Sequence, residues 1–357
     1  MCARLHEAKG ETRVISVSDE KVMRQYLLDK GFVSAGEECS IQYLPGGVSC
    51  ETVRVKTGAR EFVIKQALPK LRVKEDWFSD IRRIFTEKDC LSVYYRLVPK
   101  STPELFFCDD ENYLFGMEAA PEQAEMWKKQ LLRGTVDFRV GGNVASALAT
   151  VHNATNKDAV VRERFKEVEL FIQLRIDPYW NKIAERHPQL AKEINTEIER
   201  NLSTKLALVH GDYSPKNILV TPERLYILDF ECAHFGDPAY DVGFITNHLM
   251  LKAVKNKAWA QAYLNLMQAM VEEYFSIIDF IGRGTLEANT VRTLAFLFLA
   301  RVDGKSPAEY ITEDNDKDFI RKVSYAMVRD NLKTYEEVVS LMLHSLGKSK
   351  GTYAHAH

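Results

Sequence analysis

The sequence predicts an α+β fold, with a small antiparallel sheet in an N-terminal lobe and a larger, mostly helical C-terminal lobe. Two observations carry this prediction. Extended runs separated by turn residues occupy 40–66, whereas apolar residues beyond Pro121 recur mainly at helical intervals. A chain of 357 residues is long enough for each lobe to bury a core of its own.

The N-terminal lobe is expected to hold an antiparallel meander. Extended runs separated by turns lie at 41–44, 51–55 and 61–65. Apolar residues at helical spacing mark 79–97, and a further extended run at 113–117 ends shortly before Pro121, which stops the strand. We therefore divide the chain into an N-terminal lobe at 1–117, a hinge at 118–121 and a C-terminal lobe at 122–357.

The C-terminal lobe is expected to be helical with one interruption. Helical patterns lie at 143–152, 166–174, 190–202, 259–280, 290–301 and 318–346. Between them come three short apolar runs, at 206–209, 218–220 and 226–228. A turn at 222–224 separates the last two runs and predicts a hairpin.

The composition is typical of a globular protein and does not indicate binding to nucleic acid or to a membrane. An apolar fraction of 46% and a charged fraction of 27% are those of an ordinary globular chain. The formal net charge of −2 gives no overall attraction to nucleic acid or to an anionic membrane. The six cysteines are scattered, without a zinc-like or disulfide-like spacing, and no stretch is apolar enough for a signal peptide or a membrane span. We expect a cytoplasmic protein; its oligomeric state stays open.

The strongest functional signal is the motif His210-Gly211-Asp212-Tyr213-Ser214-Pro215-Lys216-Asn217, followed twelve residues later by Asp229-Phe230-Glu231. Phosphoryl transfer needs a carboxylate to accept or orient a hydroxyl, and oxygen ligands to hold Mg²⁺ against nucleotide phosphates. Asp212 suits the first role, and Asn217, Asp229 and Glu231 suit the second. The predicted hairpin brings Asn217 near Asp229, and an extended backbone would turn Glu231 to the same side.

The N-terminal lobe supplies candidate nucleotide-binding residues. Lys65 closes an apolar strand and suits pairing with α- and β-phosphates, and Glu87, on the apolar side of the predicted helix, is its candidate partner. The glycine turn that contains Gly46, Gly47 and Ser49 offers backbone amides to phosphate oxygens. At the hinge, Met117, Glu118 and Ala120 offer backbone groups to an adenine edge. A solvated lysine and a plain linker are the structural alternatives.

Other polar residues have structural interpretations beside functional ones. Asp241 precedes an apolar run, which favours a helix N-cap or a buried strut under the motif over direct chemistry. Arg175, Arg301 and Lys305 are possible anchors for an anionic group, although lone basic residues are mostly solvated or structurally paired.

At these residues the sequence resembles the aminoglycoside phosphotransferase and choline kinase superfamily. Within it, the run Val63-Ile64-Lys65-Gln66-Ala67-Leu68-Pro69, with Trp77 and Glu87 after it, is similar to the methylthioribose kinases. The resemblance implies a two-lobed, protein-kinase-like fold, Asp212 as catalytic base, the three metal ligands named above, and Lys65 with Glu87 at the phosphates. The chain departs from the methylthioribose kinases at 213–217, and that family's paired arginines are not recognisable near Arg301.

The expected activity is therefore a small-molecule kinase that uses ATP and Mg²⁺ and phosphorylates a hydroxyl. A sugar-like alcohol, an amino alcohol such as choline or ethanolamine, and an aminoglycoside all remain open as substrates. A catalytically silent nucleotide-binding pseudokinase or interaction module is the alternative. A protein substrate is disfavoured because 230–241 leaves little room for a long activation loop.

Overall fold

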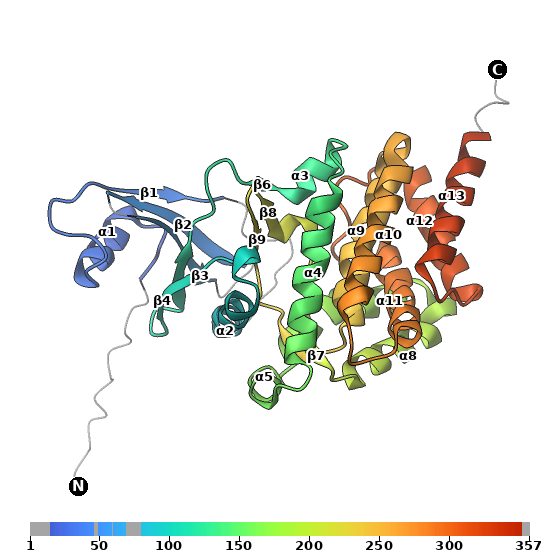
Figure 1. Cartoon of the computed structure of the whole chain (residues 1–357), viewed down its shortest axis with the longest axis horizontal. Coiled ribbons are helices and arrows are strands. Elements are labelled where there is room, and N and C mark those ends of the chain that lie inside the picture. The colour runs from blue at the N-terminus through green and yellow to red at the C-terminus, as the bar shows by residue number, and fades with distance from the viewer. Residues whose placement is uncertain (1–14, 46–48, 59, 69–79, 352–357) are drawn as a thin grey trace, which may run out of the picture. The chain divides into compact units, whose positions relative to one another are not determined.

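The computed structural model describes residues 15–45, 49–58, 60–68 and 80–351. It divides the chain into two compact units. Among the described residues, the first unit contains those up to Phe85 together with Leu105–Ala119, and the second contains Thr86–Glu104 and everything from Ala120 onward. Figure 1 labels the helices and strands of both units.

The first unit is built on a five-stranded antiparallel sheet with the order β1-β2-β3-β5-β4. Its strands are β1 (Cys39–Tyr43), β2 (Cys50–Thr57), β3 (Glu61–Ala67), β4 (Leu105–Asp109) and β5 (Leu114–Glu118). The helix α1 (Glu20–Asp29) precedes the sheet, and α2 (Arg83–Leu97) begins in this unit and continues into the second. The central strand β3 pairs with β2 on one side and β5 on the other.

The core of the first unit lies between α1 and the sheet. Asp19 caps the helix, because its side chain accepts hydrogen bonds from the amides of Lys21 and Val22. One helical turn then buries Met23 and Leu27 against strand residues that share the same core. The strand residues of this core are Cys39, Val53, Val55, Phe62, Ile64 and Leu114.

The second unit is mainly helical. Its α-helices are α3 (Trp127–Leu132), α4 (Phe138–Thr155), α5 (Ala159–Arg164), α6 (Glu169–Phe171), α7 (Lys182–Arg186), α8 (Ala191–Ser203), α9 (Ala239–Lys255), α10 (Ala260–Ile277), α11 (Arg283–Asp303), α12 (Asp314–Arg329) and α13 (Tyr335–Gly351). A π-helix, η2 (Ile172–Asn181), and 3-10 turns η1 (Pro99–Ser101), η3 (Pro188–Leu190), η4 (Pro215–Asn217) and η5 (Lys257–Trp259) complete its helical structure.

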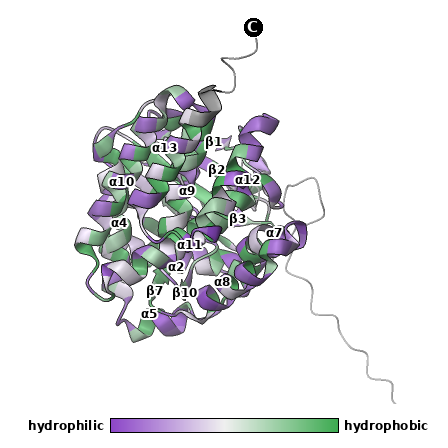
Figure 2. Cartoon of the chain, turned by 90° about the vertical axis from the view of Figure 1, so that its right-hand side faces the viewer, coloured by the Kyte–Doolittle hydropathy of each residue, from purple (hydrophilic) through white to green (hydrophobic). Residues whose placement is uncertain are grey.

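The long helix α9 lies at the centre of the second unit. It packs against α10 and α11, and α10 packs against α4, as their side-by-side course in Figure 1 shows. Nearly every residue of α9 is buried, whereas α8 buries Ile194, Glu197 and Asn201. Figure 2 accordingly shows α8 with a largely hydrophilic visible face. A helix that is buried all round is typical of the middle of a large helical core.

Short strands interrupt the helices of the second unit. The strands β7 (Ala207–Val209) and β10 (His234–Gly236) form one antiparallel pair. The strands β6 (Glu125–Met126), β8 (Ile218–Val220) and β9 (Leu225–Ile227) form a second antiparallel sheet with the order β6-β8-β9. No helix in the described part of the chain is both long and apolar enough to cross a membrane.

The predicted α+β fold is confirmed, with corrections to individual elements. The single helix expected at 318–346 is two helices, because the chain leaves the helical path at Asn331, whose φ is +49°. The helix expected at 166–174 is the short α6 followed by η2, and η2 contains Pro178, which supplies no backbone N–H to an α-helical ladder. The elements α1, α3, α5, α7, β4, β6 and β10 are additional to those predicted from the sequence.

Candidate active site

A loop between β7 and β8 carries the motif singled out in the sequence. It runs from His210 to Asn217 and ends in the 3-10 turn η4. Gly211 has a φ of +75°, and a Cβ at this position would lie 2.6 Å from the carbonyl oxygen of Cys232. Only glycine fits there without strain. The chain therefore turns sharply just before Asp212.

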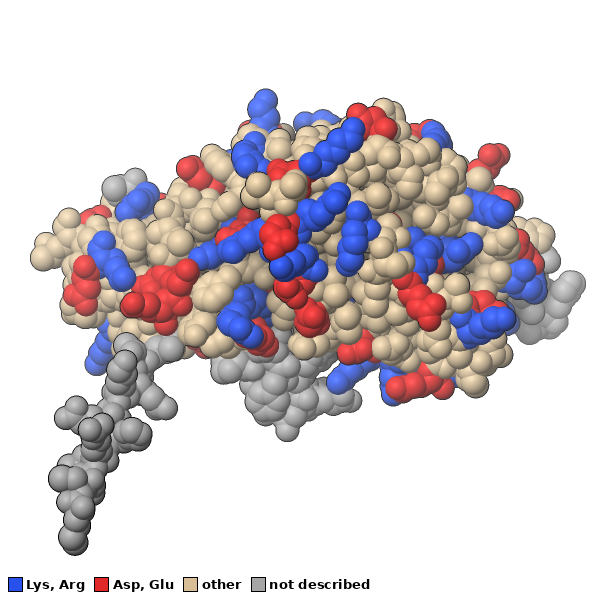
Figure 3. All heavy atoms as spheres, turned by 90° about the horizontal axis from the view of Figure 1, so that it is seen from below, with Lys and Arg blue, Asp and Glu red and all other residues tan. Residues whose placement is uncertain are grey.

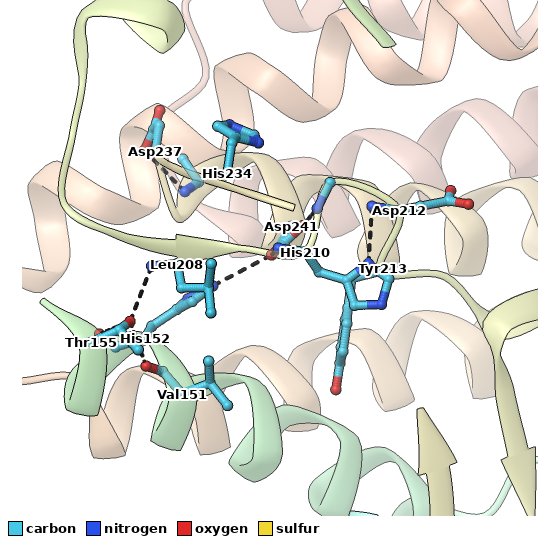
Figure 4. A network of polar contacts seen from close by, with 12 residues as sticks. Val151, His152, Thr155, Leu208, His210, Asp212, Tyr213, His234, Asp237 and Asp241 are labelled. Atoms are coloured by element: carbon cyan, nitrogen blue, oxygen red, sulfur yellow. Dashed lines mark hydrogen bonds and ion pairs between the residues drawn. The ribbon is translucent and has the colours of Figure 1, made fainter. Parts of the chain in front are cut away.

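Asp241, in the first turn of α9, holds this loop from beneath. Its carboxylate accepts hydrogen bonds from the amide of His210 at 2.6 Å and from the amide of Gly211 at 2.9 Å. Figure 4 shows it between the loop and His152, whose Nε2 lies 3.4 Å from Oδ2. Asp241 is thus the buried strut that the sequence suggested. The alternative N-cap role is wrong, because Pro238 occupies the cap position of α9.

The ring of His210 links the loop to the end of β9. Its Nδ1 accepts a hydrogen bond from the amide of Asp212 at 3.2 Å, and its Nε2 lies 3.2 Å from the carbonyl oxygen of Leu228. One accepting and one donating nitrogen describe a neutral imidazole. Burial lowers the pKa of His210, which agrees with this neutral form. His210 therefore acts as a fixed spacer between the two halves of the site.

Asp212 is buried, and its two carboxylate oxygens differ in their surroundings. Asn217 donates from Nδ2 to Oδ2 at 2.8 Å and to the backbone carbonyl oxygen of Asp212 at 3.0 Å. Oδ2 also lies 2.9 Å from Nη2 of Arg175 and 3.0 Å from Nζ of Lys216. Within the described part of the chain, no hydrogen bond reaches Oδ1 of Asp212. Three donors thus fix one oxygen, while the other has no protein donor among the described residues.

The charges around Asp212 keep it ionised. Burial by itself would raise the pKa of this carboxyl group, but the positive charges of Arg175 and Lys216 outweigh burial and hold the pKa below its ordinary value. The negative charge of Asp229 acts in the opposite direction. That electrostatic effect requires Asp229 to lie near Asp212 in the folded chain.

The hairpin of β8 and β9 brings the two parts of the motif together, as predicted. Ile218 pairs with Ile227, and the amide of Leu228 donates to the carbonyl oxygen of Asn217 at 2.9 Å. The backbone beyond β9 is not extended, however, because Asp229 has a φ of +73° and residues 231–232 form a turn. The alternation expected to align Asp229 with Glu231 is therefore wrong. A non-glycine residue in the left-handed region is strained, and such strain is common at functional sites.

The predicted metal ligands match the preferences of Mg²⁺ in their chemistry. With Nδ2 donating to Asp212, the Oδ1 atom of Asn217 is left to accept or to bind a cation. The charges of Asp229 and Glu231 both raise the pKa of the buried thiol of Cys232, after the larger effect of burial. The described residues contain no cluster of three or more His, Cys, Asp or Glu side chains that could hold a metal. An amide, two carboxylates and nucleotide phosphates are nevertheless a common Mg²⁺ environment.

The predicted nucleotide-binding residues lie in the first unit or at its borders. Lys65 is on β3, opposite Thr52 and Phe115, and Glu87 is buried on α2 in the second unit. Their pairing stays a prediction. Met117 and Glu118 end β5, and Ala120 begins the second segment of the second unit. Gly46, Gly47 and Trp77 lie outside the described residues.

Ser49 has a structural position in the first unit. Its carbonyl oxygen accepts from the amide of Leu68 at 2.9 Å and from the guanidinium of Arg83. Its hydroxyl donates to the sulfur of Cys50, 3.8 Å away. The backbone at the end of the glycine turn is thus tied to β3 and to the start of α2. A role for Ser49 at phosphates stays a prediction.

The pairing of Arg175 and Lys216 with Asp212 was not predicted. The sequence suggested Arg175 only as a possible substrate anchor, since 37 residues separate it from Asp212 and it lies in an irregular π-helix. Arg175 also donates from Nε to the carbonyl oxygen of Gly211 at 2.8 Å. For Lys216, the spacing of four residues from Asp212 was the only signal in the sequence.

Comparison with known proteins agrees with the predicted fold. The family model described as "Phosphotransferase enzyme family" matches residues 40–273. A methylthioribose kinase of Citrobacter koseri is 26% identical over 221 residues, which are 55% of this chain and 55% of that protein. Methylthioribose kinase 2 of Oryza sativa subsp. japonica is 27% identical over 233 residues, 55% of this chain and 53% of that protein. The chain thus spans about half the length of these curated relatives.

A solved structure of a Plasmodium vivax ethanolamine kinase shares the fold. It aligns over 92% of this chain and 99% of its own, with a TM-score of 0.55 at 14% identity. The protein-kinase-like fold is therefore confirmed, as is the expected superfamily of aminoglycoside phosphotransferases and choline kinases. The similarity to methylthioribose kinases is distant. Because the family model matches well over half of the sequence, the chain belongs to the phosphotransferase enzyme family.

Proposed function

We propose that the chain is an ATP-dependent kinase that transfers the γ-phosphate to a hydroxyl of a small molecule. The observation that carries this proposal is the asymmetry of Asp212. Its Oδ2 is held by Asn217, Arg175 and Lys216, whereas Oδ1 receives no hydrogen bond from the described residues. A substrate hydroxyl can donate to Oδ1 and be held for in-line attack on the phosphate.

The lowered pKa of Asp212 supports orientation of the substrate hydroxyl as its main role. A carboxylate whose pKa lies below its ordinary value is a poor proton acceptor at neutral pH. Kinase transition states are loose, so strong deprotonation of the nucleophile before attack is not needed. Asp212 would align the hydroxyl and take its proton late. The nearby ammonium of Lys216 would help to meet the charge on the transferred phosphoryl group.

We propose Asn217, Asp229 and Glu231 as the residues that hold Mg²⁺. The metal, when bound, neutralises charge on the nucleotide phosphates. Asn217 has an unused amide oxygen, since its nitrogen is committed to Asp212. The same side chain would thereby couple the position of the metal to the position of the orienting carboxylate.

The nucleotide-binding assignments extend the proposal to the N-terminal lobe. Lys65, supported by Glu87, would bind the α- and β-phosphates, and the turn with Gly46, Gly47 and Ser49 would cover them. Met117, Glu118 and Ala120 would offer backbone groups to the adenine edge. In this proposal the N-terminal lobe is 1–117, the hinge 118–121 and the C-terminal lobe 122–357.

The acceptor is proposed at the level of a class. The curated relatives named above are methylthioribose kinases, which favours a sugar-like alcohol. An amino alcohol such as choline or ethanolamine, or an aminoglycoside, is the next candidate within the superfamily. A catalytically silent nucleotide-binding module is the competing function; it would not need the orienting carboxylate with its unoccupied oxygen.

A screen for ADP formation tests the proposed function. The full chain is incubated with ATP and Mg²⁺ and a panel of sugars, amino alcohols, hydroxy acids and aminoglycosides. We expect at least one compound to stimulate ADP formation strongly above the rate without an acceptor. ATP binding without stimulation by any compound would support the silent module instead.

A further inference from the structure

A group of buried cationic and phenolic side chains in the second unit has no role in the mechanism proposed above. Its central members are Lys252 on α9, Arg301 on α11 and Tyr310 in the following connection. Lys252 is fully buried, and Arg301 is 8% exposed. Lys128 on α3 lies at the edge, with its Nζ 5.6 Å from the centroid of the Tyr310 ring, and Nζ of Lys252 lies 5.3 Å from the same centroid. Two ammonium groups therefore share one aromatic ring.

The donors of this group are poorly satisfied. Nζ of Lys252 makes one hydrogen bond, to the carbonyl oxygen of His248 at 3.2 Å. Nε of Arg301 and the hydroxyl of Tyr310 are buried and have no hydrogen-bond partner among the described residues. Buried donors without acceptors normally destabilise a fold. A ligand that accepts hydrogen bonds would remove this cost.

The group also lacks negative charge. Within the described residues, neither Lys252 nor Arg301 forms an ion pair with a carboxylate. Glu309 is near, but it already pairs with Lys128, and its side chain is 64% exposed. Burial, with smaller contributions from the positive charges of Lys128 and Arg301, lowers the pKa of Lys252 to about 7. Figure 3 shows basic and acidic side chains interspersed on the surface it presents, unlike this buried group of one sign.

The group borders the catalytic loop. Arg301 donates from Nη1 to the hydroxyl of Tyr179 at 3.0 Å and to the carbonyl oxygen of Ser306 at 2.6 Å. Burial would raise the pKa of Tyr179, but Arg301, Arg175 and Lys216 lower it. The pKa of Tyr179 is therefore lowered by two sets of cations: Arg175 and Lys216, which hold Asp212, and Arg301, which belongs to this group. Lys216, on the loop side, has a side chain that is 48% exposed.

We propose that Lys252, Arg301 and Tyr310 bind a negatively charged group of the acceptor, so that the substrate is an alcohol that carries a carboxylate or a phosphate. The inference rests on the proposed kinase function, because Asp212 would then orient the hydroxyl of the same molecule. An anion is the ligand that satisfies unpaired buried donors and cations together. A cationic acceptor such as choline or an aminoglycoside would meet repulsion at this site.

Binding of matched small alcohols tests the proposal independently of turnover. Glycerate and glycerol 3-phosphate serve as the anionic probes, and glycerol and ethanolamine as the neutral and cationic ones. Each is titrated calorimetrically into the full chain at low ionic strength, with Mg²⁺ and a non-hydrolysable ATP analogue present so that phosphate does not occupy the nucleotide site. We expect at least one anionic probe to bind about 10-fold or more tightly than both counterparts. Which anion binds distinguishes a carboxylate from a phosphate, and equal affinity for neutral, cationic and anionic probes overturns the proposal.

Variants assign the binding to this group. Lys252→Met and Arg301→Gln should each lower the binding affinity for the anionic probe by about 10- to 100-fold. This is the loss expected for one hydrogen bond to a charged group. Lys255→Met on α9 and Arg292→Gln on α11 are matched controls, because both side chains are exposed on the same helices. The controls should bind like the wild type. Undiminished binding in both test variants contradicts the assignment.

A stability measurement separates ligand binding from a structural role. Lys252→Met should keep or raise the melting temperature, because it removes a buried cation that lacks a carboxylate partner. A large fall in melting temperature with unchanged anion binding would make Lys252 structural and overturn the proposal. Failure of the proposed kinase function would give a different result. No acceptor would stimulate ADP formation, but the anionic probe would still bind, and Lys252→Met would still lower its affinity.

Discussion

Nη2 of Arg175 lies 2.9 Å from Oδ2 of Asp212, and both side chains are largely buried. Arg175 comes from the π-helix η2 and Asp212 from the loop after β7, so the contact joins two irregular segments of the second unit. Arg175, Asn217 and Lys216 together hold Oδ2 of the carboxylate through contacts within the protein. The orientation of the other oxygen follows from these contacts, and so does the proposed chemistry.

Replacing Arg175 by Met should therefore affect both folding and activity. The substitution leaves the buried carboxylate of Asp212 without its guanidinium partner, which should lower the free energy of unfolding by about 3 kcal/mol. Stimulated ADP formation should fall about 10-fold or more, because the carboxylate is no longer held in one orientation. Chemical denaturation and steady-state kinetics measure the two effects.

The matched control for this substitution is Arg329→Met. Arg329 pairs with Asp330 at 2.7 Å, but its side chain is 74% exposed, so its loss should cost about 0.5 kcal/mol or less. If Arg175→Met behaves like this surface variant in stability and in turnover, the ion pair does not organise Asp212.

Replacing Gly211 by Ala should disrupt the loop. A Cβ would have to adopt a φ of +75° and would lie 2.6 Å from the carbonyl oxygen of Cys232, so we expect a loss of about 2 kcal/mol or more in the free energy of unfolding. Gly284→Ala is the control, because Gly284 lies in α11 with nothing within 4 Å of its added Cβ. That change should be neutral or stabilising by about 0.5–1 kcal/mol. Equal thermal stability of the two variants would be inconsistent with the close approach described for Gly211.

Replacing Asp241 by Asn tests the strut beneath the loop. The amide retains one acceptor oxygen, so one of the amides of His210 and Gly211 would lose its hydrogen bond and face an NH₂ group. We expect destabilisation by about 2 kcal/mol and reduced turnover, measured by thermal unfolding and ADP formation. Asp279→Asn, at an exposed position, should change neither property. Normal turnover and stability in Asp241→Asn would show that the loop does not need this support.

Part of this site was predictable from the sequence, and the limit has a physical reason. Asn217 and Asp229 flank a hairpin whose turn is marked at 222–224, and local pairing brings them together. The φ of +73° at Asp229 was not predictable, since side chains other than glycine rarely adopt it and nothing in the local sequence requires it. Arg175 reaches Asp212 only through tertiary packing of a π-helix, which has no periodic signature of its own.

The fold shows the same division between local and tertiary signals. The extended runs of β2 and β3 and the apolar periodicity of α10 gave correct element types, because local pattern and burial agree there. The continuous helix expected at 318–346 was wrong, since apolar periodicity persists across the break at Asn331. The metal and nucleotide assignments stay predictions.

Lys252 should give stability a distinctive dependence on pH. Its pKa falls from an ordinary value of 10.5 to about 7 on folding. Between these values the unfolded chain binds more protons than the folded chain, so the contribution of Lys252 makes the fold more stable as pH rises from about 7 towards 10. The charged or titratable groups around Lys252 are Lys128, His248, Arg301, Glu309 and Tyr310.

Comparison of the wild type with Lys252→Met isolates this contribution. Unfolding free energies are measured by chemical denaturation at several pH values between 7 and 9. We expect the variant to gain stability relative to the wild type at pH 7 and to lose that advantage as the pH rises. Parallel pH profiles for the two proteins would mean that Lys252 keeps its ordinary pKa in the fold.

The most direct test of the role proposed for Asp212 is the Asp212→Asn variant, assayed with an acceptor found in the screen. Calorimetry measures its affinity for ATP with Mg²⁺, and ADP formation measures its turnover. We expect ATP affinity within a few fold of the wild type and turnover lower by about 1,000-fold, because the hydroxyl loses the carboxylate that aligns it and takes its proton. Turnover close to that of the wild type would contradict the role assigned to Asp212.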